Sequence, residues 1–318
     1  MKDYTLKYGK GSVTFALDEA HVTELYGTPV PKIDDIRAAL YATLSSPVSH
    51  EPLESWVNPE DKVALIVSDM SRFWMRQDLV VPHIISYLTD KCDVNQNNIT
   101  IIIAHGTHPG GDENELRTLV TDGVYDRIRV VNHDCQAKDL VYIGTTSLGT
   151  EVRINPIAAN ADKVIMLGAC TYHVMAGYGG GRKSILPGIS GLETIRQNHL
   201  HSLDLLAPRS NPLIGNGVTD GNPLNEDMCQ AAAMVKNLFG INLVTNADMQ
   251  LAHIISGDPM KSWQLACHRV DEIYRVPIVK KADVIITSCG GYPKDINLYQ
   301  GIKTLLNMGQ AVKPGGTM

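Results

Sequence analysis

Residues 62–74, KVALIVSDMSRFW, decide the fold of this chain. Residues 63–67 are continuously apolar and lack the alternation that marks a strand with one solvated face. A strand buried on both faces is typical of a parallel sheet that helices cover on both sides. Polar residues follow at once, so we expect a loop with chemical function at the carboxyl end of this strand.

Similar short β-branched runs recur along the chain and alternate with segments of helical period. The further predicted strands are 98–104 (NITIIIA), 127–133 (RIRVVNH), 162–168 (DKVIMLG), 241–246 (INLVTN) and 282–288 (ADVIITS). The predicted helices cover 34–44, 79–88, 113–120 and 191–200. The pattern predicts the α/β class, with mostly parallel sheets flanked by helices.

A length of 318 residues favours two domains. We expect a catalytic and cofactor-binding α/β domain over residues 1–272 and the start of a second α/β domain over 273–318, with the active site in the cleft between them. One strand and one helix cannot bury their own faces, so we expect the natural chain to continue beyond residue 318.

Composition narrows the class of ligand. The net charge of −6 and the lack of any Lys/Arg cluster argue against a nucleic-acid or anionic-membrane partner. No apolar run approaches the length of about 18 residues that a membrane span needs. The six cysteines are scattered without a CxxC pair, which is typical of reduced thiols, so we expect a cytoplasmic protein that binds small molecules.

Polar side chains follow the predicted strands at the edge where ligands bind in an open α/β sheet. Any one of them could be structural, as a helix cap, an ion-pair partner or a hydrogen-bonded core histidine. Their coincidence at four strand ends predicts one site. The residues are Asp69, Ser71, Arg72, His105, His108, His173, Gln300 and Lys303.

The glycine-rich segment GYGGGRKS, residues 177–184, matches neither standard phosphate-binding loop. A P-loop needs glycine where Arg182 stands, and the third glycine of a dinucleotide fingerprint would also fall on Arg182. Gly179, Gly180 and Gly181 beside two cations still suit the phosphate of a mononucleotide. Lys183 is either a surface lysine or an amine that carries a covalent cofactor.

A metal site built from protein alone is not indicated. His199 and His201 are two residues apart and cannot face the same side of a helix. Neither H-E-x-x-H nor a paired-cysteine spacing occurs. Any metal would therefore take most of its ligands from something other than protein.

The motifs taken together resemble the nickel-pincer lactate racemase family. They are HVMAGYGGGRKSILPGISG (173–191) and NH (198–199), with SDMSR (68–72) and GTH (106–108) before them and Gln300 and Lys303 after them. The resemblance covers essentially the whole chain. It implies an isomerase that acts as racemase or epimerase on lactate or a larger 2-hydroxy acid.

The resemblance also implies a cofactor. In that family a pyridinium-3,5-dithio mononucleotide is tethered to a lysine through a thioamide and supplies carbon and sulfur ligands to nickel. The tether here would be Lys183 and the protein ligand to nickel His199, with Gly179 to Arg182 beside the nucleotide. Separate biosynthetic enzymes make this cofactor, so they are implied as maturation partners.

The same resemblance gives the remaining roles. His108 and His173 would be the two acid/base groups, one on each side of the substrate, while hydride leaves and returns to the α-carbon. Arg72 and Lys303 would bind the substrate carboxylate. Asp69 and Gln300 would orient neighbouring groups.

The chain departs from the family pattern at Pro109, where arginine is common, and at Phe73, where proline is common. With Trp74 and Tyr292, Phe73 would shape a pocket for a larger substrate. Two other hypotheses stay open: a pyridoxal-type Schiff-base enzyme that uses Lys183, and a non-catalytic α/β protein that binds a sugar phosphate.

Overall fold

The computed structural model describes residues 1–292 and 295–318, and for Tyr299 and Gln300 it describes the backbone only. The chain forms two compact units, residues 28–273 and residues 1–27 with 274–318. The boundary at 272/273 stays a prediction. The structure adds that the first 27 residues pack with the C-terminal segment.

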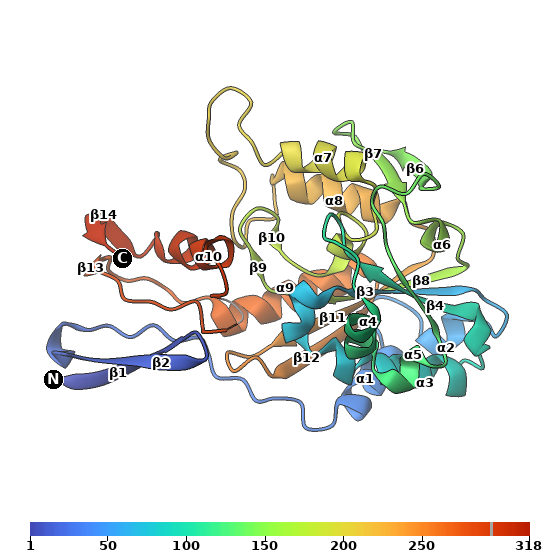
Figure 1. The fold of residues 1–318 in the computed structure, drawn as a ribbon, viewed down its shortest axis with the longest axis horizontal. Helices are drawn as coiled ribbons and strands as arrows, with labels where there is room; N and C mark the ends of the chain where they lie inside the picture. The colour runs from blue at the N-terminus through green and yellow to red at the C-terminus, as the bar shows by residue number, and fades with distance from the viewer. Residues whose placement is uncertain (293–294) are drawn as a thin grey trace. The chain divides into compact units, whose positions relative to one another are not determined.

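The unit 28–273 is built on a six-stranded sheet with the order β12-β11-β8-β3-β4-β5 (Figure 1). All neighbouring strands are parallel except β11 and β12, which confirms a mostly parallel α/β sheet. The strands are β3 (Val63–Ser68), β4 (Ile99–Ala104), β5 (Arg129–Asn132), β8 (Lys163–Ala169), β11 (Leu238–Thr245) and β12 (Leu251–Gly257).

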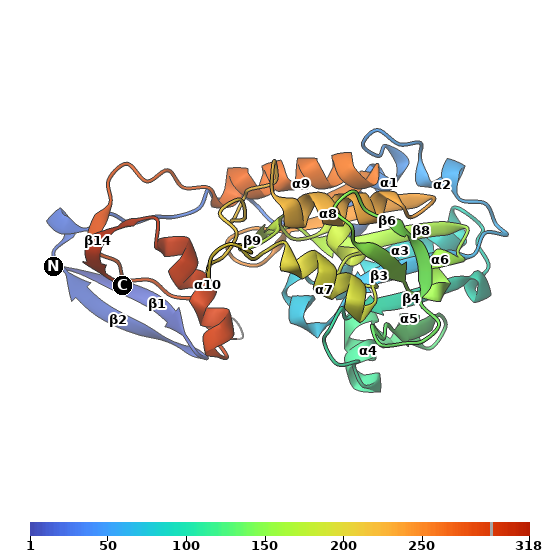
Figure 2. The same ribbon diagram turned by 90° about the horizontal axis from the view of Figure 1, so that it is seen from above.

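Both faces of this sheet are covered, as the apolar run at 63–67 predicts. Leu65 and Val67 pack into one core with helices on one side, whereas Ala64 and Ile66 pack into a second core on the other. The first core takes side chains from α1 (Ile36–Ser45), α3 (Val81–Asp90), α4 (Glu113–Val120) and α5 (Asp122–Tyr125). The second takes them from α6 (Pro156–Ala159), α7 (Leu192–Leu200) and α8 (Pro223–Ala233). The layers on the two sides are visible in Figure 2.

The predicted helices match α1, α3, α4 and α7, and five of the predicted strands lie in the sheet. The prediction for 282–288 is wrong in extent, because only Ala282–Val284 forms a strand, β13, which pairs with β14 (Val312–Thr317) outside the large sheet. Val284 and Ile286 are exposed there, so no second layer buries this run.

The unit 28–273 also contains other helices, turns and strand pairs. They include α2 (Leu53–Trp56), the β6 (Val141–Thr145) and β7 (Glu151–Ile154) pair, the β9 (Tyr172–His173) and β10 (Gly177–Tyr178) pair, the 3-10 turns η2 (Met70–Met75) and η5 (Gly181–Ser184), and α9 (Pro259–Tyr274), whose last residue is counted with the other unit.

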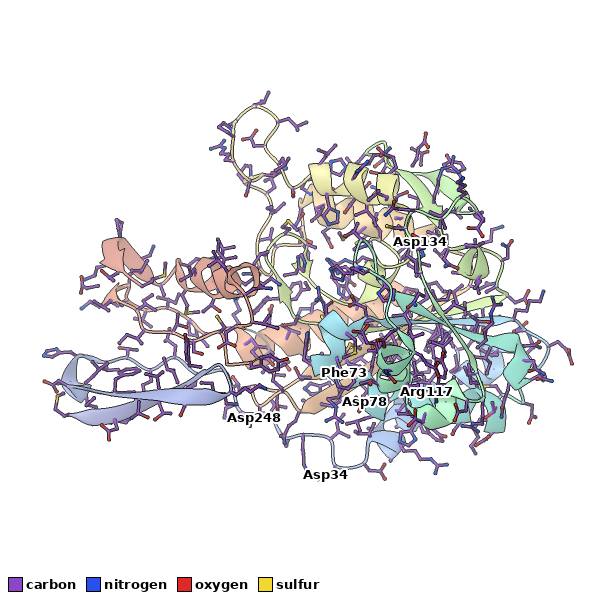
Figure 3. All side chains as sticks on the ribbon, in the orientation of Figure 1. Asp34, Phe73, Asp78, Arg117, Asp134 and Asp248 are labelled. Atoms are coloured by element: carbon purple, nitrogen blue, oxygen red, sulfur yellow. The ribbon has the colours of Figure 1, made fainter. Side chains whose placement is uncertain are left out.

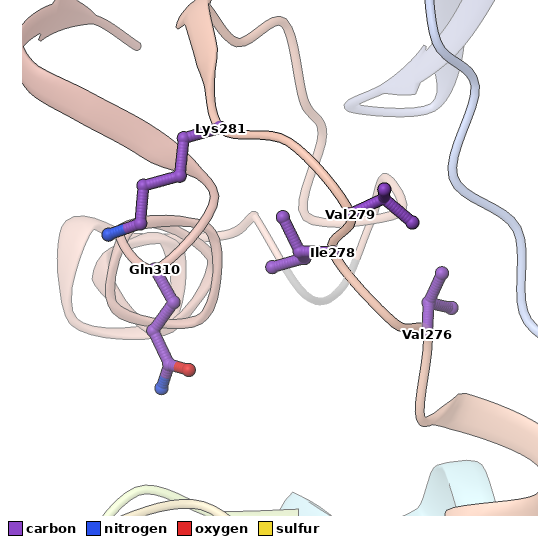
Figure 4. Close-up of a pocket in the computed structure, with 5 residues that line it drawn as sticks. All are labelled: Val276, Ile278, Val279, Lys281 and Gln310. Atoms are coloured by element: carbon purple, nitrogen blue, oxygen red, sulfur yellow. The ribbon is translucent and has the colours of Figure 1, made fainter.

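The other unit consists of the hairpin β1 (Lys2–Tyr8) and β2 (Gly11–Leu17), with β13, β14 and α10 (Leu298–Met308). The Gly9 amide donates to Asp295, and its carbonyl accepts from the Tyr292 amide at 2.8 Å. Figure 4 shows a depression in this unit lined by Val276, Ile278, Val279, Lys281 and Gln310. It includes none of the predicted site residues. Within the described residues, no helix combines the length and apolar character that crossing a membrane requires.

Candidate active site

The loops that carry the predicted residues leave the same edge of the sheet. β4, β3 and β8 are parallel neighbours, so their carboxyl ends lie together. The Gly106 amide, after β4, donates to the Gly188 carbonyl at 2.9 Å and so joins the loop of His108 to the loop of Lys183. The structure therefore brings together the residues that follow these three strands.

Asp69 and His108 form a hydrogen-bonded pair. Asp69 Oδ2 lies 2.5 Å from His108 Nδ1, and Asp69 Oδ1 accepts from the Ser71 hydroxyl at 2.6 Å. Burial alone would raise the pKa of Asp69, but the hydrogen bonds from His108 and Ser71 outweigh it and leave the pKa below its usual value. An ionised Asp69 accepts from Nδ1–H of His108, and in the neutral tautomer with that proton the lone pair lies on Nε2.

Arg72 lies on η2, next to this pair. Its Nη1 donates to the hydroxyl and carbonyl of Ser71 at 3.0 and 3.2 Å, and its charge helps to lower the pKa of Asp69. Phe73, labelled in Figure 3, and Trp74 are partly buried against the first core. The guanidinium and two aromatic rings thus follow Asp69 within one short turn.

His173 lies on β9, and its ring is fixed by the backbone that follows it. Its Nδ1 accepts from the amides of Met175 and Ala176 at 3.3 and 3.1 Å. A neutral imidazole has one lone pair, so the ring proton lies on Nε2. This Nε2 is 3.2 Å from Lys183 Nζ.

His199 has the opposite arrangement. Its Nδ1 donates to the Ile195 carbonyl at 2.9 Å, one turn earlier on α7, so the lone pair lies on Nε2. Burial first, and then the charge of Lys183, lower the pKa of His199 and favour the neutral ring. A histidine that donates its other nitrogen to a carbonyl is the usual state of a metal ligand.

Arg182 is buried inside the loop, which does not favour the predicted contact with a phosphate. Its side chain is fully buried and lies with Cζ 3.8 Å from the centroid of the Trp263 ring. All five of its N–H groups donate to protein acceptors, which are Asn225 Oδ1 (2.9 and 2.7 Å) and the carbonyls of Tyr178 (2.9 Å), Gly180 (3.3 Å) and Ala176 (2.7 Å). Arg182 therefore holds the loop from inside, because its guanidinium has no donor left for a ligand.

Two of the three amides of the glycine run, residues 179–181, also donate hydrogen bonds to the protein itself. The Gly179 amide donates to the Thr171 carbonyl at 2.7 Å, and the Gly181 amide donates to Asn242 Oδ1 at 3.0 Å. The glycines instead permit close packing. A Cβ on Gly181, which has φ of +50°, would lie 2.7 Å from the Trp263 ring. The expected phosphate cradle is thus a tightly packed turn that presents Lys183.

The described residues contain no group of three His, Cys, Asp or Glu side chains that could hold a metal ion. His199 offers a single nitrogen, and the half-buried Lys183 lies near enough for its charge to act on that ring. These residues fit a metal that takes its other ligands from a cofactor attached to the protein. They do not fit a metal site in which the protein supplies all the ligands.

Three predicted residues lie in the other unit, and one of them, Tyr292, is exposed there. Lys303 is a partly buried residue of α10, and the side chain of Gln300 lies outside the described residues. Their predicted roles stay predictions.

Sequence reasoning missed two supports of the site. Asp271, on α9, accepts from the hydroxyls of Tyr172 and Tyr178 at 2.7 Å each and so ties β9 to β10. Asn242 lies fully buried in β11 and holds the Gly181 amide. The single amide side chain of Asn242 within an apolar strand could have indicated its role. The sequence around Asp271 contains no comparable indication.

Two family models match the chain. They are the lactate racemase N-terminal domain, over residues 8–209, and the lactate racemase C-terminal domain, over residues 278–318. The lactate racemase of Thermoanaerobacterium thermosaccharolyticum is 29% identical over 327 residues, covering 100% of this chain and 74% of that protein. The lactate racemase of Lactiplantibacillus plantarum is 28% identical over 318 residues, covering 98% and 73%.

Solved structures agree with these matches. The lactate racemase apoprotein from Thermoanaerobacterium thermosaccharolyticum superimposes with a TM-score of 0.88 at 28% identity, over 99% of this chain and 73% of that one. A Thermotoga maritima protein superimposes with a TM-score of 0.58 at 18% identity, over 79% and 61%, and shares the fold.

Proposed function

The chain belongs to the lactate racemase family, and from this premise we propose that it inverts a 2-hydroxy acid through a lysine-tethered nickel-pincer nucleotide. Racemases are isomerases, and the named relatives place this chain among them. The observation that carries the proposal is the trio of His173, Lys183 and His199. The amine of Lys183 lies 3.2 Å from one ring, and its charge acts on the other.

His108 is the proposed base for the substrate hydroxyl. Its Nε2 carries the lone pair, and Asp69 stabilises the positive ring that forms when this nitrogen takes a proton. The same carboxylate keeps the ring in one tautomer and one orientation, as in a Ser-His-Asp triad. His173 is the second proposed acid/base group, with Nε2 as its working atom.

When bound, the nickel-pincer nucleotide supplies a centre that accepts hydride from the α-carbon and returns it. In this proposal Lys183 holds the nucleotide and the Nε2 of His199 binds nickel. Arg182 keeps the loop under Lys183 rigid without touching the ligand. Enzymes that build the cofactor are then required for maturation, and the scattered reduced cysteines support a cytoplasmic setting.

Arg72 is the proposed partner of the substrate carboxylate, because its guanidinium lies beside the Asp69–His108 pair. Lys303 and Gln300 keep their proposed roles at the substrate. Phe73 and Trp74, with Pro109 where the family often has arginine, favour a substrate with more apolar bulk than lactate.

The test uses protein matured with the cofactor-building enzymes and nickel. Single enantiomers of lactate and of larger 2-hydroxy acids are supplied, and inversion is followed by chiral chromatography. We expect inversion of at least one acid, in both directions, and a sulfur-containing nucleotide adduct on Lys183 by intact mass. An imine on Lys183 that borohydride traps, with no inversion of any acid, would instead support the Schiff-base enzyme.

A further inference from the structure

Two carboxamide side chains bind the backbone near Asp69 and His108. Each contacts both the N–H and the C=O group of a single residue, as two directly opposite residues do in an antiparallel strand pair. They are Gln77, which binds Ser68, and Asn132, which binds Gly111. The proposed mechanism uses neither side chain.

Gln77 extends the hydrogen bonding of β3 to the residue before Asp69. The pairing of β3 with β8 ends at Ile66. Two residues later, the Ser68 amide donates to Gln77 Oε1 at 3.2 Å, and Gln77 Nε2 donates to the Ser68 carbonyl at 2.8 Å. The Gln77 side chain is fully buried, where hydrogen bonds are stronger than in water. The backbone that carries Asp69 is therefore held as it would be within a sheet.

Asn132, the last residue of β5, closes the loop that carries His108. The Gly111 amide donates to Asn132 Oδ1 at 3.3 Å, and Asn132 Nδ2 donates to the Gly111 carbonyl at 2.8 Å. The same Oδ1 lies 2.7 Å from Nε2 of His105, so His105 also donates to it. His105 precedes His108 by three residues and Gly111 follows it by three. One amide thus joins the two ends of this loop.

We propose that Gln77 and Asn132 are positioning residues that hold Asp69 and His108 against one another. Asp69 Oδ2 and His108 Nδ1 are 2.5 Å apart and belong to different loops. Hydrogen bonds weaken steeply away from their best geometry, and loops ordinarily move more than strands. The two amides restrict that movement on both sides of the bond. Only the importance of this bond for inversion rests on the proposed function.

The test observes the His108 ring in the cofactor-free protein. With isotope-labelled histidine, NMR correlations from ring C–H protons to ring nitrogens show which nitrogen is protonated. At about pH 8, where histidine is ordinarily neutral, the parent should have this proton on Nδ1. Gln77→Met and Asn132→Leu remove each amide at similar size, and we expect a mixture of the two tautomers in both. His108→Gln identifies the signals.

Two controls separate positioning from general loss of stability. Asn160→Leu matches Asn132→Leu, since Asn160 is exposed and its Nδ2 donates to the Pro156 carbonyl at 2.7 Å. Leu88→Ala opens a cavity in the first core. Both controls should keep the parent tautomer. The proposal is overturned if Gln77→Met or Asn132→Leu also keeps it, or if Leu88→Ala loses it.

Gln77→Asn covers the case in which Gln77→Met does not fold. Its amide is one methylene too short to reach both groups of Ser68, so the tautomers should again be mixed. A ring that keeps its proton on Nδ1 would overturn the proposal here as well.

Inversion is measured separately on cofactor-loaded protein. We expect kcat to fall about 10-fold in Asn132→Leu with KM nearly unchanged, because the base is misplaced and the substrate contacts remain. An unchanged kcat would contradict the positioning role. Mixed tautomers in the variants with no inversion by the parent would refute the proposed function alone. Inversion by the parent with unaltered tautomers in the variants would refute the positioning role alone.

Discussion

His108 and His173 are the same residue type at the same sheet edge, yet their surroundings set opposite ring tautomers. A carboxylate accepts from Nδ1 of His108, whereas two backbone amides donate to Nδ1 of His173. Nε2 is therefore a ready acceptor in His108 and a donor in His173. In the proposed mechanism one histidine takes a proton and the other gives one, so the partner of Nδ1 would decide which histidine begins as the base.

Asp69→Asn would erase this difference and should have the largest effect. The amide of asparagine donates to Nδ1 of His108, which moves the ring proton to Nε2 and makes His108 resemble His173. We expect kcat to fall about 10³-fold, roughly 4 kcal/mol of transition-state stabilisation, when racemisation of single enantiomers is measured. Asp78→Asn is the control, because Asp78 pairs with Arg76 in the neighbouring turn. Its kcat should be unchanged, and an equal loss in both variants would contradict the assignment.

Arg182→Met should damage the His173 region and spare the Asp69–His108 pair. The substitution removes the buried donors of the Tyr178 carbonyl and of Asn225 Oδ1, so we expect a loss of about 3 kcal/mol in the free energy of unfolding by urea titration. Arg196→Met, at an exposed position of α7, should change that free energy by less than about 0.5 kcal/mol. Similar losses in both variants would show that Arg182 does not hold this loop.

The six-stranded sheet could be predicted largely from sequence because burial on both faces removes the alternation in runs such as 63–67. β12 was missed because only residues 246–250 separate it from β11, where a parallel connection would need a helix. The prediction of a strand over all of 282–288 was too long. The run is apolar, but Val284 and Ile286 are exposed and no layer covers them.

The site could be predicted to the level of which loops converge, but not to the direction of each side chain. Arg182 and Lys183 are adjacent and chemically alike in sequence, yet one turns inward and the other remains half-buried beside His173. That choice depends on Asn225 and Trp263, which lie far along the chain. Local pattern cannot encode such partners, so the sequence could not predict that protein acceptors use all the donors of Arg182.

Asp271→Ala tests whether the two tyrosines hold the β9–β10 pair that carries His173. The hydroxyls of Tyr172 and Tyr178 lose a shared acceptor, and we expect about 2 kcal/mol less stability toward urea. Asp34→Ala, at an exposed site labelled in Figure 3, should leave the stability unchanged. Equal stabilities of the Asp271→Ala variant and the parent would mean that Asp271 does not hold this pair.

The smallest expected effect is the loss of stability in acid that the Asp69–His108 pair causes. The pKa of Asp69 lies below its usual value in the folded chain, so the pair with His108 contributes stability that is fully present above about pH 4. This contribution is lost as the pH falls through the folded value, because the carboxylate must then be protonated. Both proteins keep His173 and its backbone contacts, so the difference between them isolates the carboxylate. Between pH 6 and pH 3, the parent should therefore lose about 1 kcal/mol more stability than Asp69→Asn in urea titrations. Identical losses would show that the carboxylate is not what sets His108 apart.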